Sequence, residues 1–249
     1  MLISRKSSTL ASNTPLHRQR GVTLVELMVG LTVGALIMAG AITLFAKISF
    51  SGLENVRMVR LNEQLRSTLD VIRRDLQRAG YVDAWEAGVA TEIGDLEVAA
   101  MDTFGTITFG GACADGDGDG ADECDCITYS YDRNRDFEQT AGEIFGFQLN
   151  GTEIRRDISD AVCGGGAGWE GVTDGEVNIE VLSFELDPNS TITEVGDGNG
   201  DGTCESGETC LARRKINVVL EGSLSADSDF TVRLRDEIKV KNDHYYTMP

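Results

Sequence analysis

The sequence of 249 residues contains little proline, histidine or aromatic residue: 3 Pro, 2 His and 6% Phe, Trp and Tyr. So little proline excludes a collagen-like or Pro-rich chain. Basic residues are also few, because 22 Lys and Arg stand against 41 Asp and Glu, giving a formal net charge of −19. That charge excludes a strongly basic nucleic-acid-binding protein, so we expect no direct nucleic-acid partner.

The charge is unevenly distributed along the chain. Residues 22–249 contain 18 basic and 41 acidic residues, a net charge of −23. Residues 1–21 contain no acid and four basic residues, Arg5, Lys6, Arg18 and Arg20. The sequence therefore predicts a basic leader joined near residue 21 to an acidic protein.

One long hydrophobic run is present. From Val22 to Ala46 the only charged residue is Glu26. At about 1.5 Å per residue, a helix of this length would cross a bilayer core of about 30 Å. The run predicts a single transmembrane helix. Because the basic residues precede it, the positive-inside rule places residues 1–21 in the cytoplasm and the C-terminal domain across the membrane.

A secretory signal peptide is the first alternative, because such signals also begin with basic residues and an apolar run. This run is too long, however, and no small-residue cleavage pattern closes it. The carboxylate of Glu26 separates the two interpretations. It costs roughly 2.5 kcal/mol or more near a bilayer centre, so it needs a specific role.

The residues around this acid, Arg20-Gly21-Val22-Thr23-Leu24-Val25-Glu26, supply that role. The segment resembles the signal of type IV prepilins and pseudopilins, in which a basic leader ends in Gly and a hydrophobic segment has Glu at its fifth position. The resemblance implies that a membrane prepilin peptidase cuts after Gly21 and methylates Val22. The chain departs from the family in having Val22 where Phe is usual, and a leader as long as 21 residues.

Glu26 also has a physical function in an assembly of such helices. A buried carboxylate needs a cation, and the free amine of Val22 on a neighbouring subunit could provide one. That pair would fix the register between subunits. Gly30 and Gly34 form a small-xxx-small pair, which by itself is weak evidence for close helix packing.

The helix is expected to continue to Ala79. Apolar residues recur at steps of three and four, as on one face of an amphipathic helix: Leu61, Leu65, Leu69, Ile72, Leu76 and Ala79. Gly80 is a plausible C-cap. Residues 66–81 also resemble the helix end of PilW-like minor pilins, which close with an Ala-Gly-Tyr turn.

Beyond residue 100 the sequence predicts antiparallel strands, because stretches rich in Val, Ile, Phe, Tyr and Thr alternate with Gly- and Asp-rich loops. The expected strands are 104–109, 126–131, 143–149, 152–157, 176–186, 214–221 and 230–240. Asn150-Gly151 is a hairpin signal. We therefore predict an α+β fold, pilin-like, with a leader at 1–21, a hydrophobic helix half at 22–52 and a periplasmic globular domain at 53–249.

Six cysteines follow the hydrophobic run: Cys113, Cys124, Cys126, Cys163, Cys204 and Cys210. An even number in an oxidising compartment favours disulfides. Cys204–Cys210 is the preferred local pair. Cys113 is expected to pair with Cys124 or Cys126, and the remaining one with Cys163. A zinc site is disfavoured because His244 is the only histidine after the leader.

The loop from residue 197 to 208 predicts a calcium site, because it fits D-x-[DN]-x-[DN]-G-x5-E at every fixed position. The expected ligands are Asp197, Asn199, Asp201, Thr203 through its carbonyl, and Glu208. Flanking helices of an EF-hand are not expected. A disulfide across the loop would lower the entropy lost when the site forms.

Two other loops repeat part of this pattern. Asp115, Asp117 and Asp119 have the calcium spacing, but the twelfth position is a cysteine, so Asp122, Glu123 or Asp125 would have to complete the shell. Asp132, Asn134, Asp136 and Glu143 keep the spacing too, but Phe137 stands where Gly is needed. We interpret this last loop as a polar hairpin loop rather than as a calcium site.

No catalytic motif is present, and His244, near the C-terminus, is expected to be an ordinary surface residue, so we predict no enzymatic activity. The resemblance implies a minor type IV pilin that primes pilus assembly or lies at the pilus tip, in cell adhesion or twitching motility. Its partners would be the prepilin peptidase, other major and minor pilins and the inner membrane, and it would then reach the cell surface. The alternatives are a minor pseudopilin of type II secretion and a membrane-anchored calcium-dependent binding protein or hydrolase.

Overall fold

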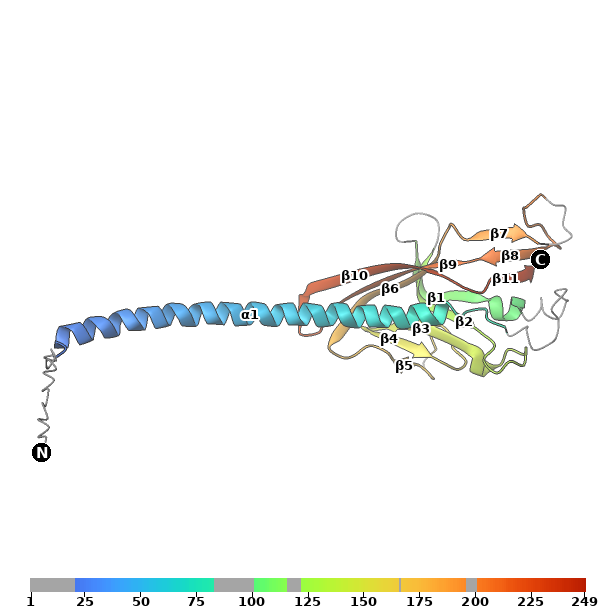
Figure 1. Ribbon diagram of the computed structural model, residues 1–249. Coiled ribbons are helices and arrows are strands. Elements are labelled where there is room, and N and C mark those ends of the chain that lie inside the picture. The colour runs from blue at the N-terminus through green and yellow to red at the C-terminus, as the bar shows by residue number, and fades with distance from the viewer. Residues whose placement is uncertain (1–20, 83–100, 116–121, 166, 196–200) are drawn as a thin grey trace, which may run out of the picture. The chain divides into compact units, whose positions relative to one another are not determined.

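A computed structural model describes residues 21–82, 101–115, 122–165, 167–195 and 201–249 (Figure 1). The chain divides into two compact units, residues 1–53 and 54–249. One long helix, α1 (Leu24–Leu76), contributes its first half to one unit and its second half to the other.

The first half of α1 is apolar. Leu24–Ser49 is the one segment among the described residues that is long and apolar enough to cross a membrane. Its side chains are exposed in the single chain, as expected of a surface that lipid or neighbouring helices would cover. Thr23 caps the helix, because the Glu26 backbone N–H donates to the Thr23 hydroxyl at 3.3 Å.

The second half of α1 packs on the sheet through the face predicted from the sequence. All six apolar residues of that face are buried: Leu61, Leu65, Leu69, Ile72, Leu76 and Ala79. They form one hydrophobic core with strand residues such as Phe147 and Leu220. The regular helix ends at Leu76, and a turn continues to Gly80, whose φ of 75° fits a helix-terminating glycine.

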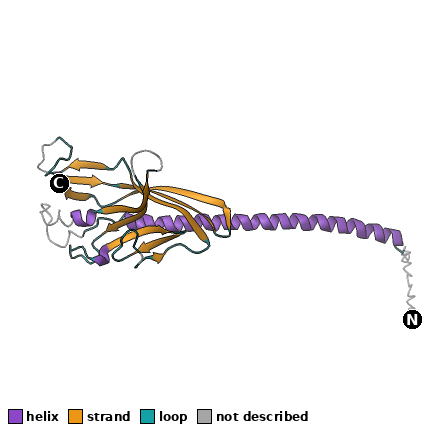
Figure 2. Ribbon diagram, turned by 180° about the vertical axis from the view of Figure 1, so that it is seen from behind, coloured by secondary structure: helices purple, strands orange, loops and turns teal. Residues whose placement is uncertain are grey.

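Eleven strands form two antiparallel sheets among the described residues (Figures 1 and 2). The larger has the order β10-β9-β6-β2-β3-β4-β5, with β1 also paired to β2, and the smaller has the order β11-β8-β7. The strands are β1 (Ile107–Ala114), β2 (Glu123–Ser130), β3 (Ile144–Asn150), β4 (Glu153–Asp157), β5 (Glu170–Gly171), β6 (Val177–Leu186), β7 (Thr191–Glu194), β8 (Thr209–Arg213), β9 (Lys215–Leu224), β10 (Asp227–Lys239) and β11 (His244–Thr247). The predicted α+β fold class is confirmed.

Four of these strands, β5, β7, β8 and β11, are absent from the sequence prediction. The expected strand 104–109 is also wrong at its start, because residues 101–105 are helical and β1 begins at Ile107. The predicted hairpin joins β3 to β4, with Asn150 paired to Glu153. Its two loop residues are therefore Gly151 and Thr152, one position later than expected, and Gly151 takes the positive φ of 64° that such a loop requires.

Candidate functional site

All six cysteines are paired, so the prediction of disulfides is confirmed. The bridges are Cys113–Cys124, Cys126–Cys163 and Cys204–Cys210. Of the two arrangements left open, the structure has Cys113 with Cys124. Because Cys124 and Cys126 both belong to β2, that strand is covalently joined to β1 and to the segment that follows β4.

The residues at the predicted cleavage point, Gly21 and Val22, are exposed and precede the first turn of α1. Glu26 lies in that turn, three residues after Thr23. Thr23 and Glu26 thus have the spacing of a capping box, of which the structure shows the half in which the Glu26 N–H donates to the Thr23 hydroxyl. An acid here also interacts favourably with the positive end of the helix dipole.

The predicted calcium loop is described only from residue 201, so Asp197 and Asn199 lie outside the described residues. Gly202 has a φ of 81°, as a sharp turn requires. The Asp201 carboxylate accepts hydrogen bonds from the Thr203 N–H and hydroxyl at 2.8 and 2.5 Å. The Glu208 carboxylate accepts one from the Glu205 N–H at 2.8 Å.

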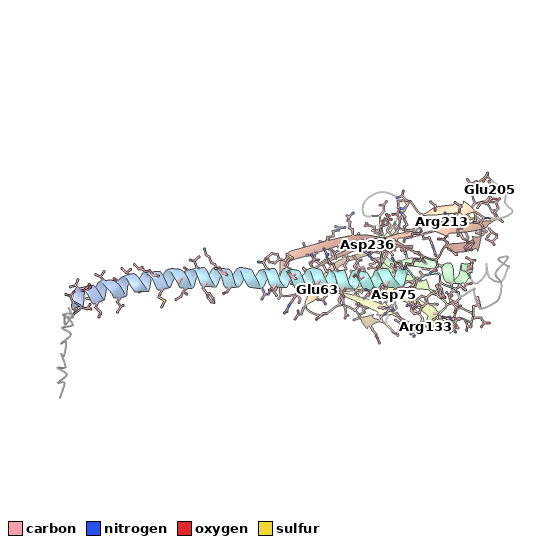
Figure 3. The ribbon with its side chains drawn as sticks, viewed as in Figure 1. Glu63, Asp75, Arg133, Glu205, Arg213 and Asp236 are labelled. Atoms are coloured by element: carbon pink, nitrogen blue, oxygen red, sulfur yellow. A yellow bond between two sulfur atoms is a disulfide. The ribbon has the colours of Figure 1, made fainter. Side chains whose placement is uncertain are left out.

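Further contacts attach this loop to Met248, which directly follows β11. The Gly207 N–H donates to the Met248 carbonyl at 2.8 Å, and the Met248 N–H donates to the Glu208 carbonyl at 3.0 Å. Glu205 lies at the end of the domain beyond Arg213 of β8 (Figure 3). The Cys204–Cys210 bridge spans the same segment, so its described part is held at both ends.

In the second predicted loop, Asp117 and Asp119 lie outside the described residues, and Asp115 is exposed at the end of β1. Asp125, one of the residues proposed to complete its shell, accepts a hydrogen bond from the Ala112 N–H at 2.9 Å. That bond directs Asp125 toward the β1 strand, beside Gly111.

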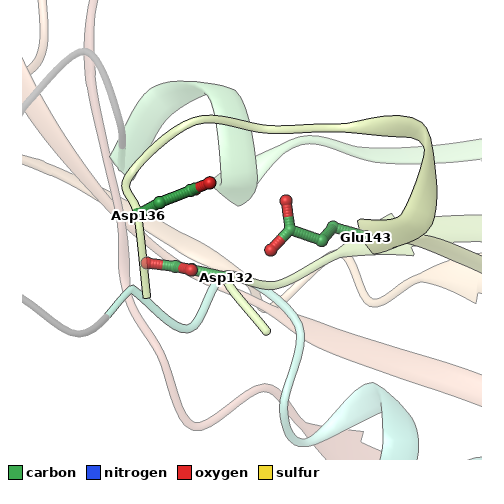
Figure 4. A group of neighbouring side chains, drawn as sticks. All are labelled: Asp132, Asp136 and Glu143. Atoms are coloured by element: carbon green, nitrogen blue, oxygen red, sulfur yellow. The ribbon is translucent and has the colours of Figure 1, made fainter. Parts of the chain in front are cut away.

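The third loop brings its acids together. Asp132, Asp136 and Glu143 are the one group of three potential metal-binding side chains that converges within the described residues, with ligand atoms within 4.8 Å of one another (Figure 4). Asp132 and Glu143 are each only 2% exposed. Three carboxylates this close repel one another unless a cation or hydrogen-bond donors compensate.

Hydrogen-bond donors of the same loop surround these carboxylates. Glu143 accepts from the Arg133 N–H at 2.8 Å and from the Thr140 N–H at 3.0 Å, and Asp132 accepts from the Arg135 N–H at 2.5 Å. Phe137 has a φ of 64°. The bulky residue thus takes the left-handed conformation for which glycine is preferred, so Phe137 does not prevent the turn of the calcium pattern. The loop joins the antiparallel strands β2 and β3, as expected of a hairpin loop. The chemistry of the three acids suits a hard cation such as Ca²⁺.

His244 is not the ordinary surface residue expected from the sequence. It belongs to β11, its side chain is 16% exposed, and its Nε2 lies 3.1 Å from a carboxylate oxygen of Asp102. The ring stacks on Tyr246 at 4.9 Å. Burial, with a further contribution from the nearby Arg214 cation, lowers the pKa of His244 below its usual value.

Arg214 connects the same elements. Its Nη1 donates to the Gly105 carbonyl, and burial lowers its pKa to about 10, so the guanidinium stays protonated at neutral pH. Gly105 lies directly against the His244 ring, where a Cβ atom would clash. Together these contacts attach the helical residues 101–105 to β11 and to Arg214, which lies between β8 and β9.

Two comparisons with protein families agree with this architecture. Residues 16–42, which include the Gly21-Val22 junction and Glu26, match the prokaryotic N-terminal methylation motif. This motif, the apolar helix and the antiparallel domain define a type IV prepilin-like protein. The type IV prepilin and pseudopilin resemblance is thereby confirmed.

Residues 54–240, about three quarters of the chain, match the family described as prepilin peptidase-dependent protein B. The chain belongs to this family. No curated protein and no solved structure matches the chain. Pilin-like families are in general structural rather than enzymatic, whereas the narrower resemblance to PilW-like minor pilins stays a prediction.

Proposed function

We propose that this chain is a minor type IV pilin that is cut by prepilin peptidase after Gly21 and methylated on Val22. The observation that carries the proposal is the succession of a methylation motif at residues 16–42 and a prepilin peptidase-dependent domain at residues 54–240. The precursor lies in the inner membrane through Leu24–Ser49, with its C-terminal domain in the periplasm. Other major and minor pilins are its assembly partners.

The charge of the domain favours a minor subunit at the tip over the main repeating subunit of the filament. Residues 54–249 contain 17 basic and 40 acidic residues, a net charge of −23. Identical domains packed densely along a filament would repel one another at this charge. A position at the tip, from which the subunit primes assembly, requires few copies.

The proposal also assigns calcium to the loop 197–208. In its described part, Gly202 provides the turn, Asp201 and Glu208 supply carboxylates, and the Cys204–Cys210 bridge limits the freedom of the chain. Ca²⁺ bound there would offset the repulsion between the acids. The loop 115–126 is a second candidate, and the convergent acids Asp132, Asp136 and Glu143 provide a third.

Co-expression with a prepilin peptidase tests the processing step. The wild-type precursor should lose residues 1–21 and gain one methyl group on Val22, as measured by intact-mass spectrometry. A Gly21→Val variant should stay at the precursor mass. If both proteins keep the precursor mass with an active peptidase, the assignment is wrong.

A Glu26→Gln variant separates processing from assembly. Because Glu26 is proposed to pair with the Val22 amine of a neighbouring subunit, the variant should be cut normally but be depleted from sheared filaments. A Glu180→Gln variant, which changes an exposed acid of β6 in the same way, is the control. Equal incorporation of the two variants would contradict the proposed pairing.

A further inference from the structure

A pocket of about 220 Å³ lies at the start of the part of α1 that belongs to the second unit. Arg57 and Arg60 line it from α1, in the first two turns of that part. The remaining lining residues come from α1, from the start of β6 and from the turn between β9 and β10: Leu61, Gln64, Glu176, Val177, Leu224, Ser225 and Ala226. The pocket thus combines two guanidinium groups with an apolar wall.

The two cations of this pocket are not neutralised by the described residues of the domain. Arg57 and Arg60 are exposed, and neither forms an ion pair within 4.0 Å of a described residue. Glu176 is the one acid in the lining. The lining therefore has a net positive charge, and its guanidinium groups are available to an anion.

The remainder of the domain is strongly acidic. Residues 61–249 contain 15 basic and 39 acidic residues, a net charge of −24, whereas residues 54–60 contain two Arg and one Glu. An anionic surface is therefore repelled by most of the domain. The start of α1 in the second unit is the part of the domain that an anionic surface can approach.

The same two arginines follow closely on the apolar segment that is long enough to span a membrane. Arg57 comes eight residues after Ser49, where that segment ends, and Arg60 eleven residues after it, about 12 and 17 Å along a helix. Long side chains of helical residues lean toward the N-terminus, so both guanidinium groups lie about one turn closer to the membrane than their backbone. These distances are comparable with the Debye length of about 8 Å, so the charges of lipid headgroups act on both side chains.

From this pocket, its charge and its place in the chain we infer that the domain binds the headgroup of an anionic phospholipid. Arg57 and Arg60 pair with the lipid phosphate, and the apolar side chains of the lining contact the glycerol part of the lipid. The contact holds an otherwise acidic domain at the membrane surface before the subunit leaves it. The inference rests on the membrane position given under the proposed function, and it adds a lipid ligand that cleavage after Gly21 does not require.

Native mass spectrometry of the full-length protein in neutral detergent tests this lipid site. The wild type, titrated with phosphatidylglycerol or with phosphatidylcholine, should bind the anionic lipid at least tenfold more tightly. An Arg57→Gln/Arg60→Gln variant should lose this preference. An Arg66→Gln/Arg74→Gln variant removes the same charge from exposed residues of the same helix that lie outside the pocket, and it should keep the preference.

Three results would overturn the inference: equal binding of the two lipids by the wild type, an equal loss of preference in both variants, or an unchanged preference in the Arg57→Gln/Arg60→Gln variant. Displacement of phosphatidylglycerol by an equal concentration of inorganic phosphate would also overturn it, because the pocket would then be a site for free anions. The titration uses the unprocessed chain, so its failure leaves the proposed cleavage and methylation intact. The mass of the processed N-terminus reports on those steps separately.

Discussion

Asp75 of α1 forms an ion pair with Arg156 of β4, with 2.6 Å between the Asp75 Oδ2 and Arg156 Nη2 atoms. Arg73 makes a second ion pair, also at 2.6 Å, with Asp236 of β10. Asp75 and Asp236 lie along the packed half of α1 in Figure 3. Because β10 and β4 lie in opposite halves of the larger sheet, the two pairs fasten the helix on both sides of its buried face.

The Asp75–Arg156 ion pair is the more buried of the two and should contribute more to the stability of the domain. The Asp75 side chain is 11% exposed and the Arg73 side chain is 43% exposed. We expect Asp75→Ala to lower the free energy of unfolding by about 2 kcal/mol, because the partly buried Arg156 loses its partner. Arg73→Ala should cost less, about 1 kcal/mol, because it removes the most exposed of the four side chains but leaves Asp236, whose side chain is 16% exposed, without its partner. Urea unfolding of both variants checks this, and a larger loss for Arg73→Ala would contradict the account.

The disulfides should differ in their contributions to stability. Cys126–Cys163 closes a separation of 37 residues and Cys204–Cys210 one of 6. Loop-closure entropy gives about 4 kcal/mol for the first and about 2 kcal/mol for the second. Thermal unfolding of the two double Cys→Ala variants should show the greater destabilisation for Cys126 and Cys163. The reverse order would show that local strain or a bound ion, rather than chain entropy, controls the effect.

Calcium should stabilise the domain, and the stabilisation should depend on Glu208. The Glu208→Ala variant is expected to lose more melting temperature in calcium than in chelator, because the hydrogen bond from the Glu205 N–H is lost in both conditions but the calcium ligand only in the first. Asp136→Asn, measured in the same way, tests the convergent acids of the third loop. Equal melting of wild type and Glu208→Ala in calcium would exclude the loop 197–208 as a site.

Stability should rise with pH near the usual pKa of histidine. The folded-state pKa of His244 is lowered, so the unfolded chain binds the proton more readily than the folded chain does. The stability that neutral, buried His244 contributes is therefore fully present above about pH 6.5, and it is lost as the pH falls toward the folded-state pKa. Urea unfolding from pH 5 to 7.5 should show a smaller slope for His244→Gln, and an unchanged slope would contradict the assignment.

The sequence predicts best the part of the fold in which apolar residues recur at a regular period over many residues. The helical face from Leu61 to Ala79 was identifiable because each of its apolar residues repeats at the helical period and is buried on one sheet. Strands β7, β8 and β11 contain only four or five residues each and take their stability from pairing with one another. A single sequence cannot show such pairing.

The third acidic loop shows a different limit. Spacing identified Asp132, Asp136 and Glu143, but the residue type of Phe137 argued against the turn that brings them together. Backbone hydrogen bonds to Asp132 and Glu143 compensate for the unfavourable φ of Phe137. Residue preference is a tendency of a few kcal/mol at most, and several such bonds are sufficient to reverse it.

Quantitative mass spectrometry of sheared surface filaments tests the central claim most directly. The account predicts a methylated peptide that begins at Val22, present at a small fraction of the amount of the main subunit. A peptide found only in the membrane fraction, together with loss of exoprotein secretion on deletion of the gene, would contradict it and would assign the protein to a secretion pseudopilus.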